Sequence, residues 1–261
     1  MNTVGFHVLA ATLAFNLVPA VSQAEEANPL SFNASVTTDY RYRGVSQSRL
    51  KPALQGGADY ASPSGWYVGT WASTIKWISD AGATAGVDTG NANIELDIYG
   101  GYKGEIRKDL AYDVGLLQYV YPGNSYGNIA GARNANTLEL YGALSFGPMT
   151  LKYSHSLTTL FGAGDSKNSG YLDLSASFDV GSGFTLAPHI GYQKVARNSA
   201  YSYTDYSATM SKDIVGFTLS AALVGTQTKT VSGNLNSLAY PSPDGRNLGK
   251  AGLVLAIKKT L

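Results

Sequence analysis

After an apolar N-terminal stretch, the chain alternates apolar and polar residues with a period of two, in short segments separated by turn-forming residues. In the clearest segment, 93–103, Ile94 and Leu96 fall on one face and Glu95 and Asp97 fall on the other. A helix with about 3.6 residues per turn would mix these two sets, whereas a β-strand separates them. The pattern therefore indicates a protein built from β-strands.

The alternation predicts twelve strands along the chain. We expect them near residues 31–43, 52–61, 66–77, 93–104, 110–121, 137–146, 149–160, 170–180, 184–195, 203–212, 217–227 and 248–260. The connections between these strands alternate between short and long. The short ones are 62–65, 105–109, 147–148, 181–183 and 213–216, and the long ones are 44–51, 78–92, 122–136, 161–169, 196–202 and 228–247.

Strict alternation of five tight turns with six long loops is the arrangement of a membrane barrel whose chain ends lie on the same side. We therefore expect an all-β fold: a transmembrane, up-and-down antiparallel β-barrel of about twelve strands. The long loops are expected to be extracellular and the short turns periplasmic. The last predicted strand, 248–260, would close the barrel and be the strand used during insertion by the barrel assembly machinery.

The N-terminal residues have the pattern of a secretory signal peptide. An apolar stretch, 8–21, precedes Ser22-Gln23-Ala24, which places small residues at the −3 and −1 positions of a cleavage site. We expect residues 1–24 to be a cleaved signal peptide and 25–261 to form a single barrel domain. An uncleaved anchor is the alternative, but the stretch is shorter than the roughly 20 residues that a spanning helix needs. The expected destination is the bacterial outer membrane, reached through the periplasm.

Composition agrees with a membrane barrel and excludes several other classes. Only 14% of the residues are charged, which is low for a protein whose whole surface faces water. The net charge of +1 gives no electrostatic footprint for nucleic acid. Cysteine is absent, so disulfides and thiolate catalysis are excluded. Glycine-rich stretches lack the Lys-Ser/Thr of a phosphate loop, and acidic loops lack calcium-binding spacing, so we expect no cofactor and no metal.

If the apolar face of each strand meets lipid, the opposite face lines the lumen. A charge on the lipid face costs about 2 to 4 kcal/mol near the membrane midplane, which directs charged residues inward. The candidate pore-lining residues are Asp39, Arg41, Arg43, Asp59, Glu95, Asp97, Lys103, Asp113, Glu139, Lys152, Asp173 and Asp179. Two interpretations stay open: rings of charge that set ion preference, or a salt-bridge network that fills a narrow barrel.

Aromatic residues gather toward the predicted strand ends. They include Tyr40, Tyr42, Tyr60, Trp66, Tyr67, Trp77, Tyr102, Tyr119, Tyr121, Phe146, Tyr171, Phe184 and Phe217. Amphipathic rings prefer the two membrane interfaces, so we interpret these residues as aromatic girdles around the barrel. The alternative is the general preference of Tyr and Trp for any β-strand.

Histidine is the remaining candidate for catalysis, and the chain after residue 24 has His155 and His189. The tripeptide Ser154-His155-Ser156 brings an outer-membrane hydrolase into consideration. On a strand, however, His155 points away from both neighbouring serines, so neither can form the hydrogen bond that a catalytic triad requires. His189 falls on the predicted lumen face, where we expect a structural role. We therefore expect no catalytic residue and no enzyme.

Two regions carry a family resemblance. The sequence TDYRYRGVSQ at 38–47, followed by GWYVGTWAS at 65–73, resembles the opening of the TorF-family porins, which are exported proteobacterial proteins. The segments NIELDIYGGYKGEI at 93–106 and AYDVGLLQYVYPG at 111–123 are similar to the middle strands of the same family. The resemblance implies an outer-membrane barrel with a pore, and it implies no particular substrate.

These observations favour a porin-like outer-membrane channel for passive diffusion of small polar or ionic solutes. A non-conducting structural or adhesive barrel, acting through the loops 122–136 and 228–247, is the main alternative, and a hydrolase is a further one. The expected partners are outer-membrane lipid and lipopolysaccharide, the barrel assembly machinery and small polar solutes, but not nucleic acid.

Overall fold

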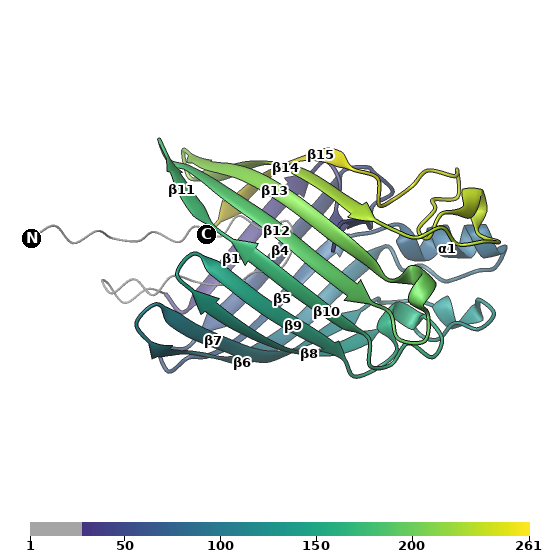
Figure 1. The fold of residues 1–261 in the computed structure, drawn as a ribbon, viewed down its shortest axis with the longest axis horizontal. Helices are drawn as coiled ribbons and strands as arrows, with labels where there is room; N and C mark the ends of the chain where they lie inside the picture. The colour runs from purple at the N-terminus through teal and green to yellow at the C-terminus, as the bar shows by residue number, and fades with distance from the viewer. Residues whose placement is uncertain (1–27) are drawn as a thin grey trace, which may run out of the picture.

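The computed structural model describes residues 28–261, and the predicted signal peptide lies outside the described residues. Within the described chain, one antiparallel sheet of 13 strands curls into a closed barrel (Figure 1). Its strands are β1 (Leu30–Thr37), β4 (Ala53–Ala61), β5 (Trp66–Thr74), β6 (Ile94–Arg107), β7 (Leu110–Val120), β8 (Thr137–Phe146), β9 (Met149–Ser156), β10 (Gly170–Ala176), β11 (Phe178–Gly181), β12 (Phe184–Lys194), β13 (Tyr203–Ile214), β14 (Phe217–Gln227) and β15 (Gly252–Thr260).

The barrel has twelve strand positions plus one extra strand, because β11 continues from β10 and pairs with the same neighbour, β12. Strand β1 pairs with the last strand, β15, which closes the wall. Further backbone hydrogen bonds join Phe32 and Leu261 at this seam. The predicted all-β, up-and-down antiparallel barrel is therefore confirmed.

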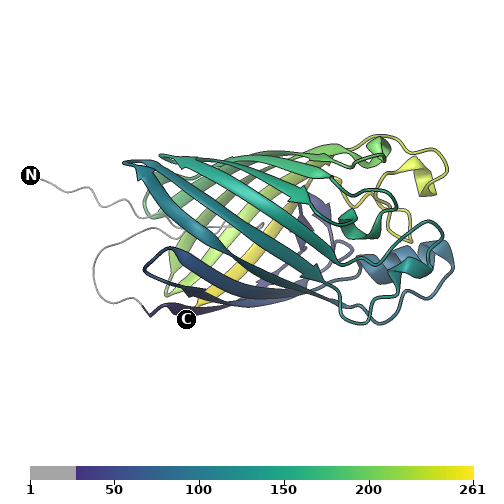
Figure 2. The same cartoon turned by 90° about the horizontal axis from the view of Figure 1, so that it is seen from below.

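Loops and turns lie at opposite ends of the barrel. The connections that hold helix α1 (Trp77–Ala85) and the other long segments gather at one end, here called the loop end (Figures 1 and 2). The tight turns and the C-terminus lie at the other end, the turn end. No helix within residues 28–261 is long and apolar enough to cross a membrane. The alternation of short and long connections that the sequence predicted is confirmed.

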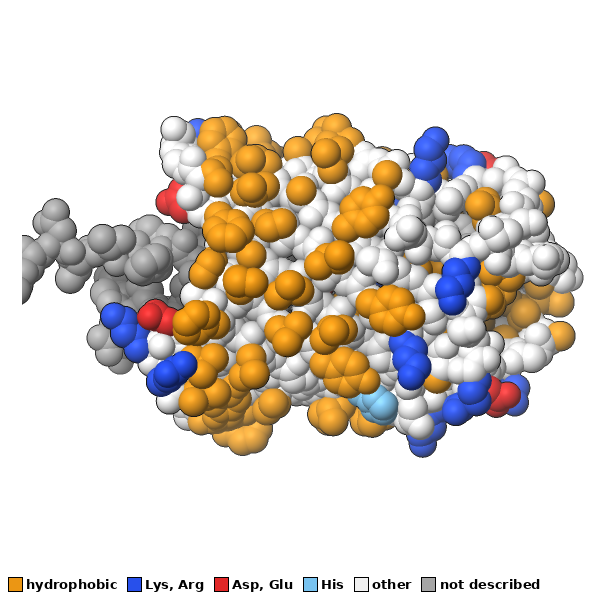
Figure 3. Space-filling model, in the orientation of Figure 1, with side chains coloured by type: hydrophobic (Ala, Val, Ile, Leu, Met, Phe, Trp, Pro, Cys, Tyr) orange, Lys and Arg blue, Asp and Glu red, His pale blue; other side chains and the backbone are white. Residues whose placement is uncertain are grey.

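A band of apolar side chains covers the outside of the barrel (Figure 3). Its exposed members include Leu54, Val68, Ile98, Leu116, Leu140, Leu151, Leu172, Ile190, Leu223 and Leu253. Each of them alternates along its strand with a residue that faces the lumen. Because apolar surface of this extent is unfavourable in water, the band is the surface that would contact the hydrocarbon of a membrane.

The largest difference from the predicted strands concerns residues 31–43. Strand β1 ends at Thr37, and the chain leaves the wall and turns inward. There it forms a hairpin of β2 (Arg41–Tyr42) and β3 (Val45–Ser46). The two turn residues, Arg43 and Gly44, have φ angles of 45° and 80°. Positive φ at both positions is the geometry of a tight two-residue hairpin turn. We call residues 39–48 the lumen hairpin.

Three other predicted strands are shorter than expected at the loop end. The predicted 66–77 ends at Thr74, just before α1 begins, and the predicted 149–160 ends at Ser156. The predicted 248–260 starts only at Gly252. In each case, the apolar residues beyond the strand end, Ile75, Leu160 and Leu248, are buried in the loop segments and do not continue the wall.

Candidate functional site

The lumen hairpin contacts three strands on one side of the barrel interior, β8, β10 and β12, through one side chain, Arg43. Its Nη1 donates a hydrogen bond to Oε1 of Gln193 on β12 at 2.6 Å, and its Nη2 donates to Oε2 of Glu139 on β8 at 2.7 Å. The guanidinium also lies over the ring of Tyr171 on β10, 4.2 Å from its centroid. Only 6% of Arg43 is exposed. The hairpin is therefore docked inside the barrel rather than lying across its mouth.

A second guanidinium, that of Arg41, fixes the base of the hairpin. It pairs with Asp39 through Nε. Its Nη1 donates to the carbonyl oxygens of Gly44, Leu248 and Lys250 at 3.0 to 3.1 Å. These contacts satisfy the charge of Arg41 within the hairpin and the segment that leads into β15, so little of it acts on the rest of the lumen.

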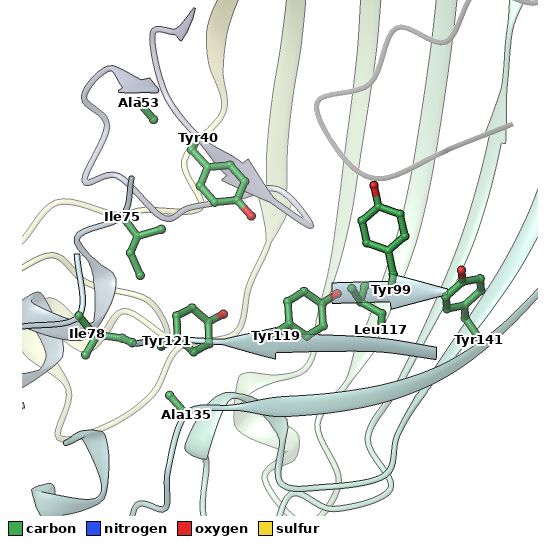
Figure 4. Close-up of a cluster of buried hydrophobic side chains, with 11 residues drawn as sticks. Tyr40, Ala53, Ile75, Ile78, Tyr99, Leu117, Tyr119, Tyr121, Ala135 and Tyr141 are labelled. Atoms are coloured by element: carbon green, nitrogen blue, oxygen red, sulfur yellow. The ribbon is translucent and has the colours of Figure 1, made fainter. Parts of the chain in front are cut away.

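Tyrosine hydroxyls connect the hairpin to β6 and β7. Tyr40 donates a hydrogen bond to Glu95, which also accepts one from Tyr121 at 2.7 Å. The hydroxyls of Tyr42 and Tyr119 lie 2.7 Å apart. Figure 4 shows the ring of Tyr40 on the hairpin above the row formed by Tyr119 on β7 and Tyr121 just past its end. The middle of the lumen is thus packed with phenol rings whose polar ends meet carboxylates.

These positions correct part of the predicted aromatic girdle. Trp66, Phe146, Phe184 and Phe217 are exposed on the outside, as a girdle requires. The inward-facing members are Tyr40, Tyr42, Tyr67, Tyr119, Tyr121 and Tyr171, which hydrogen-bond to groups in the lumen. Tyrosine suits both places, because its ring packs and its hydroxyl needs a polar partner in either one.

Three carboxylates surround the inner end of the hairpin. Glu139 is paired with Arg43, and Glu95 accepts the two tyrosine hydroxyls. Asp97 lies on the same face of β6 as Glu95 and is fully buried. Within the described residues, neither of its carboxylate oxygens has a hydrogen-bond partner. A buried carboxylate without a partner is costly, so Asp97 is an unsatisfied polar group at the inner end of the hairpin.

Nearer the turn end, the lumen carries charges of both signs. Tyr67 donates to Asp113, and the ammonium of Lys152 lies 4.0 Å from the ring centroid of Tyr141. Lys103 lies 5.8 Å from the ring centroid of Tyr67. The three charged residues lie on β6, β7 and β9, and the alternation of each strand directs their side chains into the lumen.

His189 lies inside the barrel between two carboxylates. Its Nε2 is 2.5 Å from Oδ2 of Asp173 and its Nδ1 is 3.7 Å from Oδ2 of Asp205. The hydroxyl of Tyr171 lies 3.0 Å from Nε2 and also donates to Asp205. This setting supports the structural role predicted for the histidine.

His155 is placed on the outer side of β9, where its ring nitrogens lie 3.4 Å from the hydroxyl of Tyr153 and 3.3 Å from Oδ1 of Asn168. Its neighbours Ser154 and Ser156 are buried on the opposite face. The strand geometry therefore separates this histidine from both serines.

Most of the candidate pore-lining residues come together in two groups. Asp39, Arg41, Arg43, Glu95, Asp97 and Glu139 gather at the hairpin, and Asp59, Lys103, Asp113, Lys152 and Asp173 face the lumen elsewhere. Asp179 does not join them, because it is exposed at the end of β11 beside a tight turn. The hairpin residues lie in the lumen on a turned segment and not on the wall strand that the sequence predicted.

Sequence reasoning missed two inward-facing charges, Asp205 on β13 and Lys258 on β15. Their positions in the alternation could have identified both. It also missed the hairpin, whose sequence signal is the dipeptide Arg43-Gly44 within an otherwise continuous alternating segment. No group of three or more His, Asp or Glu side chains within residues 28–261 is arranged to hold a metal ion.

A family model described as "Bacterial protein of unknown function (Gcw_chp)" matches residues 22–261. A search of curated proteins gave no match. Among solved structures, the barrel resembles the KdgM porin in complex with disordered oligogalacturonate, with a TM-score of 0.51 and 6% identity over 88% of this chain and 97% of that one. The NanC porin gives a TM-score of 0.48 and 12% identity over 88% of this chain and 98% of that one.

OprD of Pseudomonas aeruginosa gives a TM-score of 0.37 and 12% identity over 91% of this chain and 68% of that one. At such identities, the likeness to the KdgM porin concerns the fold alone. It agrees with the closed antiparallel barrel. The resemblance to the TorF family stays a prediction, because the matching model carries no such name.

Proposed function

Because the chain belongs to the Gcw_chp family of bacterial proteins, whose function is unknown, its activity must be inferred from the barrel, and we propose an outer-membrane channel for passive diffusion of small polar or ionic solutes. One observation carries the proposal. A closed wall with an apolar outer band encloses an interior lined by charged and hydroxyl-bearing side chains. Such an interior favours polar solutes, and such an exterior favours lipid.

The lumen hairpin is the constriction of the proposed channel. It lies where Arg43 reaches β8, β10 and β12, so solutes would have to pass beside it. The KdgM porin shares the barrel fold and is described with a bound acidic oligosaccharide. We infer a different solute class for the lumen of this chain, because its inward-facing acidic side chains outnumber the basic ones.

The charge balance of the wall supports small cations over anions. The inward-facing acidic residues of the wall are Asp59, Glu95, Asp97, Asp113, Glu139, Asp173 and Asp205. The inward-facing basic ones are Lys103, Lys152 and Lys258. The two arginines of the hairpin are each paired with a carboxylate, Arg43 with Glu139 of this set, and His189 lies between Asp173 and Asp205; within residues 28–261, Asp59, Glu95, Asp97 and Asp113 have no such basic partner. Negative groups that face a narrow aqueous path favour cations over anions.

Single-channel recording tests the proposal. The purified full chain would be compared in planar bilayers with a variant in which residues 39–48 are replaced by a short Gly-Ser linker. A short linker suffices, because the backbone nitrogen of Tyr40 lies 2.9 Å from the hydroxyl of Ser48. We expect discrete cation-preferring conductance from the natural chain and a several-fold larger conductance from the variant.

The outcomes separate the two parts of the proposal. A folded natural chain that stays silent at every salt concentration and voltage would overturn the channel function. Equal conductance of the two proteins would overturn the hairpin as the constriction.

A non-conducting barrel is the second candidate, and the same hairpin favours it. The contacts of Arg43 with β8, β10 and β12, together with those of Tyr40 and Tyr42 with β6 and β7, hold the hairpin in the interior, as a permanent seal would. In that case the long loops would carry the function. The silent outcome of the bilayer experiment is the result that would select this candidate.

A further inference from the structure

Exposed basic side chains gather along the loop-side border of the apolar band (Figure 3). On the face formed by β9, β10 and β12, they are Lys167, Lys194 and Arg197, with Lys229 nearby, two residues after β14 ends. We call these four residues the basic border patch. The patch is continuous, because Nη2 of Arg197 donates to the carbonyl oxygen of Lys167 at 3.0 Å. Lys229 donates to the carbonyl oxygen of Ser199, two residues after Arg197.

The charges of the patch are not neutralised by the protein. Within residues 28–261, the ion pairs involve Arg41, Arg43, Arg49, His189 and Arg246, and none includes a patch residue. The one carboxylate in the same loop, Asp165, contacts Arg197 through its backbone oxygen. Four exposed cations with so little opposing charge form a surface that attracts anions.

Directly beneath the patch, the wall is aromatic and apolar. Leu172 of β10 pairs with Tyr153 of β9 on one side and with Tyr192 of β12 on the other, and all three are exposed. Lys194 follows Tyr192 by two residues on the same outward face. Since two strand residues span about 6.6 Å, the backbone of Lys194 lies one step above the aromatic row on the same face.

At Gly170, one step above Leu172 on the outward face of β10, the ring of Tyr153 fills the place of a side chain. Gly170 pairs with His155 on one side and with Lys194 on the other, and it has no side chain of its own. The hydroxyl of Tyr153 lies 2.5 Å from the place where a Cβ of Gly170 would sit, so this ring covers the glycine. A cationic border and an aromatic and apolar strip thus follow one another toward the membrane midplane.

We propose that this surface binds a phosphate-bearing lipid of the surrounding leaflet. Its phosphate groups would lie against Lys167, Lys194 and Arg197, and its acyl chains would lie along Tyr153, Leu172 and Tyr192. Charge complementarity selects an anionic headgroup, and the adjoining apolar strip selects a lipid over a free anion. The site lies outside the barrel, so the proposal does not depend on whether the lumen conducts.

Lipid-dependent stability tests the proposal on the full chain. The urea midpoint of the folded protein in neutral detergent would be measured against increasing lipid A that carries both phosphates, against dephosphorylated lipid A, and against inorganic phosphate. We expect stabilisation by the phosphorylated lipid alone. Equal stabilisation by the dephosphorylated lipid, or by inorganic phosphate, would overturn the proposal without the need for any variant.

A matched pair of variants locates the site. K167Q/K194Q removes two exposed charges whose side chains make no hydrogen bond within the described residues, so the fold is expected to persist. R107Q/K108Q removes two exposed charges at the turn end. Since each basic residue near an anionic lipid surface contributes about 1 kcal/mol, we expect the first variant to need roughly 30-fold more lipid for the same stabilisation. An unchanged lipid requirement, or an equal change in the control, would contradict the assignment.

Discussion

Arg43 connects the hairpin to the wall through one hydrogen bond to a neutral amide, one ion pair and one aromatic ring. Arg43 contributes most through its ion pair with Glu139, a carboxylate that is only 2% exposed and would have no cationic partner without Arg43. Removing one member of a buried ion pair leaves an uncompensated charge. The resulting loss of folding free energy is larger than the net stabilisation that the intact pair provides. The residue therefore affects stability and the position of the hairpin together.

We expect Arg43→Ala to lower the free energy of unfolding by about 3 to 5 kcal/mol, because Glu139 stays buried without its ion-pair partner. Urea titration in detergent micelles, followed by tryptophan fluorescence, measures the change. Arg133→Ala is the control, since that arginine is exposed in a loop and bonds only the carbonyl of its neighbour. Equal urea midpoints for the two variants would show that the ion pair is not what holds the hairpin.

These partners could not be predicted from the sequence. Gln193 lies 150 residues from Arg43 along the chain, and Glu139 lies 96 residues away. Alternation does indicate that Glu139 and Gln193 face inward, because each occupies a lumen-facing position of a regular strand. Which inward groups meet depends on the stagger of the strands around the barrel, and periodicity carries no information about it.

Among the structural elements, the lumen hairpin shows where the period-two pattern stops being informative. Residues 39–43 alternate as regularly as a wall strand, since a hairpin inside the lumen also has two faces. Its apolar-looking face, Tyr40 and Tyr42, meets carboxylates and phenols rather than lipid. By contrast, 137–146 and 217–227 coincide with β8 and β14, because lipid on one side and the lumen on the other impose the same alternation on every wall strand.

The tip of the hairpin fits closely against the wall at Gly44. A Cβ at this position would lie 2.6 Å from Cγ2 of Thr226 and 2.7 Å from Cβ of Asp205. We therefore expect Gly44→Ala to displace the hairpin and to increase single-channel conductance at least twofold, as the linker variant would.

Gly131→Ala is the matched control for this substitution. Gly131 has a φ of 79°, close to the 80° of Gly44, but nothing lies within 4 Å of the position of its Cβ. Both variants place an alanine at a positive φ, so they share the backbone strain. Only the Cβ at position 44 would clash with the wall. If the control changed conductance as much as Gly44→Ala, the effect would come from strain in general and not from the position of the hairpin.

On the scale of the whole molecule, the balance of lumen charges sets the expected ion preference. The variant E95Q/D97N removes two negative charges at the constriction while keeping the shapes of both side chains. We expect its reversal potential in a potassium chloride gradient to move from the cation side toward zero. Asp179→Asn is the control, because this exposed carboxylate at the turn end faces away from the constriction. An equal shift in both proteins would place the selectivity outside the hairpin region.

The seam between β1 and β15 has a consequence for how the barrel is made. It joins distant parts of the chain: even Thr37 and Leu255 are 218 residues apart, and Asn33 pairs with Thr260. Until β15 has been synthesised, β1 and β14 present unpaired edges that would pair with other chains. Closure therefore waits until β15 has been made, and contacts so distant in sequence form slowly. Removal of β15 would abolish the seam and leave two open edges, while most of the wall strands would keep their neighbours.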